Sequence, residues 1–170
     1  MALLSRLGII SVVIGVLLSV VTEAAAASQV RRPGNVGIGL GVGYASGISA
    51  KYMMSQETAI QGTVGTFGAF DDDADGIAIG GDFLLEMPAF VTHEAIELAW
   101  NIGAGAGLAI FDDDGGDDDF AFSVQGVLGF EVNLVPIPLD VVIEFRPELR
   151  ILEDPDFDII DFGAHVRYYF

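Results

Sequence analysis

A chain of 170 residues with a formal charge of −18 and only seven lysines and arginines lacks the basic residues that nucleic-acid binding requires. It contains no cysteine, which excludes disulfides and thiolate metal sites. Its mean hydropathy of +0.54 also excludes an acidic disordered chain. Acidic and apolar residues must therefore be separated in space.

The first 27 residues have the layout of a secretory signal peptide. Arg6 precedes an apolar run from Leu7 to Val21, and the small residues of TEAAAAS follow. The run is shorter than the roughly 20 residues that a membrane helix needs. We therefore expect cleavage near Ala27, export of the chain and one domain over residues 28–170, with an uncleaved membrane anchor as the alternative.

Alternation with a period of two dominates the remainder of the chain. In NVGIGLGVGY, residues 35–44, glycine takes every second position, as one face of a strand would, and the third glycine of a dinucleotide-binding fingerprint is missing. Such segments predict an all-β, eight-stranded antiparallel up-and-down barrel with essentially no helix after the signal peptide. The expected strands are Val36–Tyr44, Ile48–Met54, Ala59–Phe67, Ile77–Glu86, Ile96–Phe111, Phe120–Asn133, Leu139–Leu152 and Ile159–Phe170.

The two faces of these strands differ in chemistry. One face is aliphatic and aromatic, and the other carries glycine and all the charges, with acids and bases mixed. Because an unpaired buried charge costs several kcal/mol, this mixture predicts a polar lumen and a lipid-facing apolar surface. Glycines on the first and fifth strands would leave room for long Arg and Glu side chains. The expected lumen ion-pair cluster is Lys51, Asp82, Glu86, Asp140, Glu144, Arg146, Glu148, Arg150, Asp161, His165 and Arg167.

The connections give the barrel a direction. With the N-terminus in the periplasm, SQET, MPAFVTHE and NLVPIP lie on the periplasmic side, and the turn AS and the acidic runs DDDADG, DDDGGDDD and EDPDFD lie outside. Short inner turns and longer outer loops are typical of outer-membrane barrels. Aromatic girdles at the two interfaces would contain Tyr52, Trp100, Tyr168 and Phe170 at inner strand ends and Tyr44 at an outer end.

The C-terminal sequence FGAHVRYYF, with Phe162, Val166, Tyr168 and Phe170 at alternate positions, resembles the assembly signal that the barrel-insertion machinery reads. GISAKYMMSQETAIQGTVG and PLDVVIEFRPELRILEDPDFDIIDFGAHVRYYF resemble a family of small, eight-stranded, OmpA-like outer-membrane proteins with spirochaete members. The resemblance covers the whole mature chain. The family brings no catalytic residues. We expect a monomer in the outer membrane, in contact with lipid and lipopolysaccharide.

One acidic loop partly matches a calcium-binding loop. In DDDADGIAIGGD, Asp71, Asp73 and Asp75 take ligand positions, but Asp82 at the twelfth position is expected in the lumen and no helices flank the loop. A solvated acidic rim, and loosely bound divalent cations that bridge the rim to lipopolysaccharide phosphates, are the alternatives. No other cofactor is expected.

These features predict an integral outer-membrane barrel with a filled polar lumen, acidic extracellular loops and a structural or surface-interaction role. His165 beside Asp161 and Arg167 could serve as a general base, but no serine nucleophile is placed near it, so no enzymatic activity is expected. A narrow cation-preferring pore and a soluble periplasmic lipocalin-like binder are the alternative functions.

Overall fold

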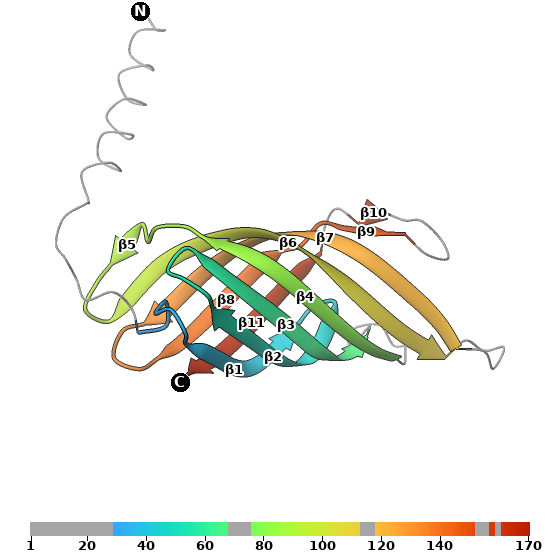
Figure 1. The fold of residues 1–170 in the computed structure, drawn as a ribbon, viewed down its shortest axis with the longest axis horizontal. Coiled ribbons are helices and arrows are strands. Elements are labelled where there is room, and N and C mark those ends of the chain that lie inside the picture. Colours follow the sequence, from blue (N-terminus) through green and yellow to red (C-terminus); the bar gives the residue numbers. More distant parts are fainter. Residues whose placement is uncertain (1–28, 68–75, 113–117, 152–156, 159–160) are drawn as a thin grey trace, which may run out of the picture.

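In a computed structural model of the chain, antiparallel strands close into a barrel (Figure 1). The structure describes residues 29–67, 76–112, 118–151, 157–158 and 161–170. Every regular element within these ranges is a strand. The wall consists, in order, of β1 (Val36–Val42), β2 (Ala45–Met53), β3 (Thr58–Phe67), β4 (Gly76–Glu86), β6 (Ile96–Asp112), β7 (Asp118–Leu134), β8 (Leu139–Phe145) continued by β9 (Glu148–Arg150), and β11 (Phe162–Tyr169), which pairs back to β1.

Two short strands lie beside this wall, because β5 (Val91–Thr92) pairs with β6 and β10 (Phe157–Asp158) pairs with β9. Counting β8 and β9 as one, the wall has the eight antiparallel strands that the sequence predicts. No helix in the described part of the chain is long and apolar enough to cross a membrane.

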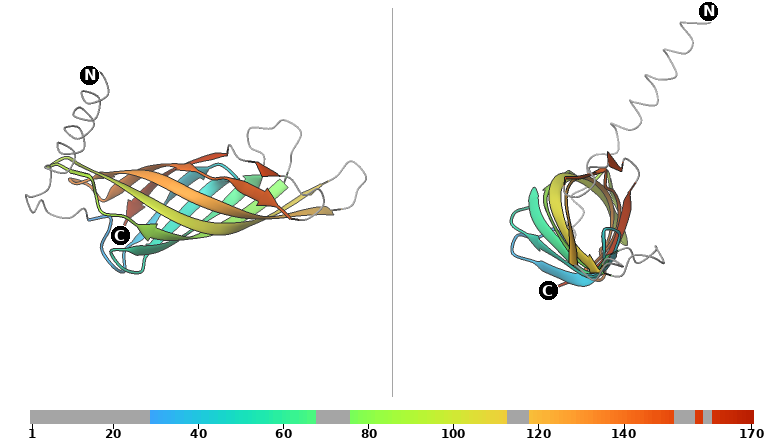
Figure 2. Two further views of the ribbon diagram at one scale, coloured as in Figure 1. Left: turned by 90° about the horizontal axis from the view of Figure 1, so that it is seen from above. Right: turned by 90° about the vertical axis from the view of Figure 1, so that its right-hand side faces the viewer.

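The strands are strongly tilted, as the oblique ribbons of Figure 2 show. Followed once around the wall, the paired registers shift by ten residues before they return to β1, which corresponds to a tilt of about 40°. Eight strands with this geometry leave an interior that side chains can just fill. We call the end with Gln29 and Phe170 the base, and the opposite end, beyond which the long β6–β7 hairpin projects, the rim (Figure 1).

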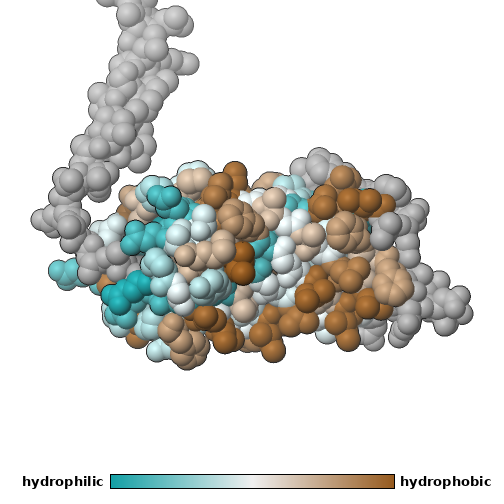
Figure 3. All heavy atoms as spheres, in the orientation of Figure 1, coloured by the Kyte–Doolittle hydropathy of each residue, from teal (hydrophilic) through white to brown (hydrophobic). Residues whose placement is uncertain are grey.

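Burial alternates along each wall strand. In β11, Phe162, Val166 and Tyr168 are exposed, whereas His165 and Arg167 between them are buried. Large exposed apolar side chains occur on every wall strand, and Figure 3 shows them over the outer surface. The predicted separation of an apolar outer face from a polar interior is confirmed.

The first turn differs from the prediction. The predicted turn residues Ala45 and Ser46 belong to β2, and the chain reverses at Gly43 and Tyr44. Gly43 has a φ of 137°, which residues with a side chain rarely adopt. The strand alternation is broken there, so Tyr44 is only 8% exposed and points into the barrel. The assignment of Tyr44 to an outer aromatic girdle is wrong, whereas Tyr52, Tyr168 and Phe170 are exposed near the base.

The seventh predicted strand, Leu139–Leu152, is interrupted at Arg146 and Pro147. Proline cannot donate a ladder hydrogen bond, but its carbonyl accepts one from the Gly126 N–H at 2.9 Å. β9 then keeps the register with β7 that β8 began. The eighth strand is described from Phe162 onward; residues 152–156 and 159–160, like the predicted signal peptide, lie outside the described ranges.

Candidate functional site in the barrel lumen

At the base, one lysine connects opposite walls of the barrel. Lys51 on β2 is 1% exposed, and its Nζ lies 2.7 Å from Glu86 Oε1 on β4. The same ammonium pairs with Glu131 on β7. Three strands separate β2 from β7 in either direction around the wall, so this ion pair spans the barrel. Asn101 on β6 completes the group by donating to Glu131 at 2.8 Å.

In the same part of the lumen, Arg167 on β11 and Asp140 on β8 are direct cross-strand partners. The guanidinium Nη2 donates to Asp140 Oδ2 at 2.9 Å and Nε donates to both carboxylate oxygens at 3.2 Å. The hydroxyl of Tyr169 donates to the same carboxylate at 2.7 Å. Arg167 Nη1 also donates to Gln61 Oε1 on β3 at 2.9 Å, so this group reaches across the lumen as well.

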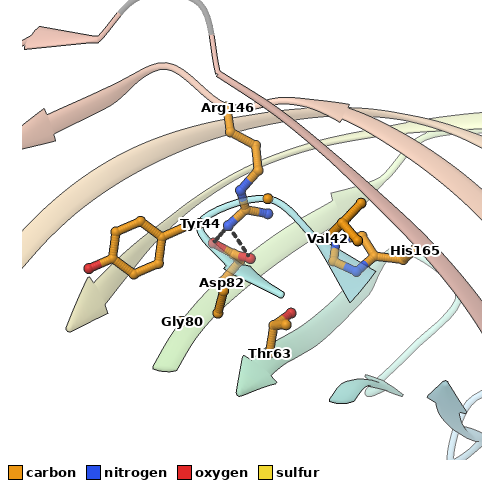
Figure 4. A pocket seen from close by; sticks show the side chains of 9 residues that line it. Val42, Tyr44, Thr63, Gly80, Asp82, Arg146 and His165 are labelled. Atoms are coloured by element: carbon orange, nitrogen blue, oxygen red, sulfur yellow. Dashed lines mark hydrogen bonds and ion pairs between the residues drawn. The ribbon is translucent and has the colours of Figure 1, made fainter. Parts of the chain in front are cut away.

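Nearer the rim, a third group surrounds Arg146. Its Nη2 lies 3.0 Å from both oxygens of Asp82 on β4, as Figure 4 shows, and its Nη1 pairs with Glu144 on β8. His165 Nε2 lies 3.2 Å from the Glu144 carboxylate. Gln61 Nε2 donates to Asp82 at 3.0 Å and to Glu144 at 2.9 Å, which joins this group to the one below it.

Neutral amides supply hydrogen-bond donors to the lumen carboxylates, because the basic residues are too few to do so alone. Buried carboxylates outnumber buried cations in the described part of the lumen. Every buried carboxylate needs donors, since desolvating it without them is costly. The four amides that donate to lumen carboxylates are Gln61, Gln125, Asn101 and Asn133. Sequence reasoning left them out of the expected cluster because it considered only ionisable residues, whereas the structure buries all four.

Two members of the expected cluster, Arg150 and Asp161, lie at the rim instead of inside. Glu148 is buried, but the Arg150 side chain is 45% exposed and its Nε lies 3.6 Å from Glu148 Oε1. Asp161 is half-exposed, and its carboxylate accepts the Phe162 backbone N–H at 2.8 Å. Both residues lie close to the point where the shorter strands of the wall end, so solvent reaches them.

The inward glycines leave room for side chains other than the predicted Arg and Glu. A Cβ on Gly37 would lie 2.6 Å from the Tyr169 ring, and one on Gly107 would lie 2.5 Å from the Tyr44 ring. Gly41 faces His165 in the same way. The expectation that inward glycines make space for neighbouring side chains is supported, but the side chains that fill this space are mainly the rings of tyrosine and histidine.

A small cavity lies in the upper lumen. Tyr44 packs inside the rim with a layer of small residues, Ala45, Ala78, Ala109 and Ala121. Below it lies a cavity of about 10 Å³, enough for roughly one water molecule. Figure 4 shows Thr63, Asp82, Arg146 and His165 around this cavity.

In one part of the lumen a carboxylate, an imidazole and a hydroxyl follow one another, on Glu144, His165 and Ser49. His165 bonds to Glu144, and its Nδ1 and the Ser49 Cβ both lie against the inner face of Gly41. Ser49 Oγ and His165 Nδ1 have no hydrogen-bond partner among the described residues. Ser49 is fully buried, and the neighbouring cavity cannot hold a substrate carbonyl, so the geometry offers no access for acyl transfer.

The predicted calcium ligands Asp71, Asp73 and Asp75 lie outside the described residues. Asp82, the twelfth position of that loop, points at Arg146 in the lumen. Within the described ranges, no group of three or more His, Cys, Asp or Glu side chains is arranged to hold a metal ion.

The base is closed by a segment that the sequence pattern did not single out. Val30 is fully buried in a cluster with Met53, Leu84 and Tyr169, and Arg31 lies 3.1 Å from Glu86. The segment has no strand periodicity, so the only signal in the sequence was an aliphatic residue followed by two arginines.

Neither a family model nor a curated protein matches the chain. Among solved structures, the N-terminal β-barrel domain of Pseudomonas aeruginosa OprF matches 81% of this chain and 98% of its own, at 14% identity and a TM-score of 0.57. Neisserial surface protein A matches 79% of this chain and 91% of its own, at 16% identity and a TM-score of 0.45. Ail of Yersinia pestis matches 80% and 95%, at 19% identity and a TM-score of 0.42. The chain therefore shares the closed antiparallel barrel fold of the OprF domain.

Proposed function

We propose that this protein is an integral outer-membrane β-barrel that conducts no ions and has a structural or surface-interaction role. The observation that carries the proposal is the hydrogen-bonded network across the lumen. Lys51 joins Glu131 on the opposite wall, and Gln61 joins Glu144 on another opposite pair of strands. A hydrated cation could pass only by displacing both sets of contacts.

The narrow-pore alternative is disfavoured by the energy of those contacts. Removing one partner of a buried ion pair leaves an uncompensated charge, at a cost of about 3–5 kcal/mol. Spontaneous opening of this kind would therefore be rare. The negative charge of the lumen would attract cations to its mouths, but the closed interior would stop them there.

The soluble lipocalin-like alternative is disfavoured by the outer face. Leu40 and Phe170 are 69% and 75% exposed, and exposed apolar residues surround the entire wall. A soluble monomer rarely carries a contiguous apolar patch above a few hundred Å². The interior is also polar, which does not suit an apolar ligand.

The proposal extends to location and partners. The expected signal peptide would export the chain, and the outward side chains Phe162, Val166, Tyr168 and Phe170 of the last strand would be read by the barrel-insertion machinery. Acyl chains of lipid and lipopolysaccharide would cover the outer face, and the acidic loops would collect divalent cations without a defined site. The proposal also includes a monomeric state and no catalytic role. Membership of the spirochaete-type family remains a prediction from the sequence.

Planar-bilayer recording on the refolded protein tests the proposal. Heat-modifiable gel migration and flotation with liposomes first establish that the barrel is folded and inserted. The expected trace is silent at both polarities, because the lumen contacts span the barrel. Steady cation-selective steps would establish the pore instead, and recovery of folded protein in the soluble fraction would establish the soluble binder.

A further inference from the structure

The segment before β1 makes an apolar contact with the interior of the barrel. Val30 has no exposed surface and packs among Met53, Ala59, Leu84 and Tyr169 at the base. Burying a valine side chain fully contributes about 1.5–3 kcal/mol. The pocket is formed by residues on several different wall strands, so it exists only once the barrel has closed.

The next residue makes a charged contact. Arg31 Nη2 lies 3.1 Å from Glu86 Oε2, and Arg31 Nε lies 4.0 Å from Glu131 Oε2. These are the two carboxylates that share Lys51. One ammonium cannot balance two buried carboxylates, so the guanidinium supplies the second positive charge.

Backbone hydrogen bonds hold the segment in place. The Gly34 N–H donates to the Met53 carbonyl at 2.7 Å, and the Met53 N–H donates to the Asn35 carbonyl at 3.0 Å. Gly34 has a φ of 90°, which turns the chain back over the base. The side chain of Asn35 donates to the Gln29 carbonyl at 2.5 Å and closes the segment into a compact loop.

We propose that the base of the barrel is a two-part binding site for an aliphatic side chain followed by a guanidinium, and that residues 29–34 of this chain occupy it as a closure segment. Val30 fills the apolar part and Arg31 fills the carboxylate part formed by Glu86 and Glu131. A groove of about 560 Å³ lies beside Arg31 and is lined by Glu57, Glu86 and Glu97. When the closure segment leaves its site, it would move into this groove. This inference rests on the base geometry and is independent of conduction or surface binding.

Cysteine labelling tests whether the segment is docked. The chain has no native cysteine, so Val30→Cys and Arg32→Cys each place a single thiol in neighbouring positions, one buried and one exposed. We expect a membrane-impermeant thiol reagent to modify Val30→Cys in the refolded protein at least about tenfold more slowly than Arg32→Cys, because the docked thiol is buried. Equal rates would show that the segment is free and would overturn the proposal.

Removal of the guanidinium tests the carboxylate part. In the Val30→Cys background, Arg31→Ala should raise the labelling rate by about tenfold or more, since it leaves Glu86 and Glu131 with one cation between them. Arg32→Ala is the matched control and should leave the rate unchanged. Gel migration before heating reports whether each variant is folded, so that a global loss of structure is not mistaken for release of the segment.

Chemical rescue tests the specificity of the site. Guanidinium chloride at non-denaturing millimolar concentrations should restore protection of the Arg31→Ala variant by at least about twofold, because a free guanidinium can bind between the same carboxylates. Sodium chloride at equal ionic strength should not. A labelling rate that Arg31→Ala leaves unchanged, or that both salts lower equally, would overturn the assignment of a guanidinium site.

Discussion

At the scale of single residues, Gln61 connects more of the lumen than any ion pair described here. Its amide donates to Asp82 and Glu144, and its carbonyl accepts from Arg167. A charged side chain could not take this place, because it would repel one set of partners. Glutamine can both donate and accept, which lets it join two carboxylates to one guanidinium.

We expect Gln61→Ala to lower the free energy of unfolding by about 1–3 kcal/mol, since it leaves three buried charged groups with one partner fewer. Gln56→Ala is the matched control, because Gln56 is exposed in the β2–β3 turn, and it should change stability by less than about 0.5 kcal/mol. Urea unfolding of the refolded barrel in lipid vesicles, followed by tryptophan fluorescence, measures both. Equal small effects would show that water replaces the Gln61 amide without loss.

At the scale of elements, the glycines of β1 decide how closely the last strand can approach. Gly37 pairs with Tyr169, and a Cβ there would lie 2.6–2.8 Å from three atoms of the tyrosine ring. The hydroxyl of this tyrosine donates to Asp140, and Tyr169 belongs to the buried cluster that contains Val30. The opening "GIGLGVG" pattern therefore allows the β1–β11 seam, where the barrel closes, to hold a tyrosine on its inner face.

We expect Gly37→Ala to destabilise the barrel by about 1–3 kcal/mol, because the overpacked seam must shift Tyr169. Gly81→Ala, on the outer face of β4 with its nearest neighbour 3.9 Å away, is the control and should be close to neutral. The two variants are compared by the urea midpoint of the refolded protein and by the fraction that shows heat-modifiable migration. If Gly37→Ala were as stable as Gly81→Ala, the tight seam would have no energetic role.

The strands themselves could be predicted because a period-two pattern survives wherever one face meets apolar surroundings. Prediction failed where a single residue breaks that rule. Gly43 rotates the chain so that Tyr44 enters the lumen, and Pro147 interrupts the seventh strand. The role of Val30 could not be predicted either, since its pocket is assembled from strands distant in sequence. The partner of each charged group could not be predicted from the sequence either, because the pairing depends on the shear of the closed barrel.

At the scale of the whole molecule, the two ends of the barrel are closed by different means. Tyr44 packs against small residues inside the rim, while Val30 and Arg31 fill the base. Between them the charged network links strands that face each other across the lumen. The outer surface is therefore the part of the protein that contacts its surroundings. Its apolar side chains determine which surroundings it favours.

Two outward residues with nearly equal exposure distinguish lipid from water around the wall. Leu40 is 69% exposed halfway up the wall on β1, and Ile77 is 68% exposed one residue from the rim end of β4. If acyl chains surround the barrel, Leu40→Arg should cost about 2–4 kcal/mol and Ile77→Arg only about 0–1 kcal/mol, because the penalty for arginine falls from the bilayer midplane to its interface. Urea unfolding in vesicles measures both values. If both substitutions changed stability by less than about 0.5 kcal/mol, height along the barrel would have no effect, and the outer face would lie in water.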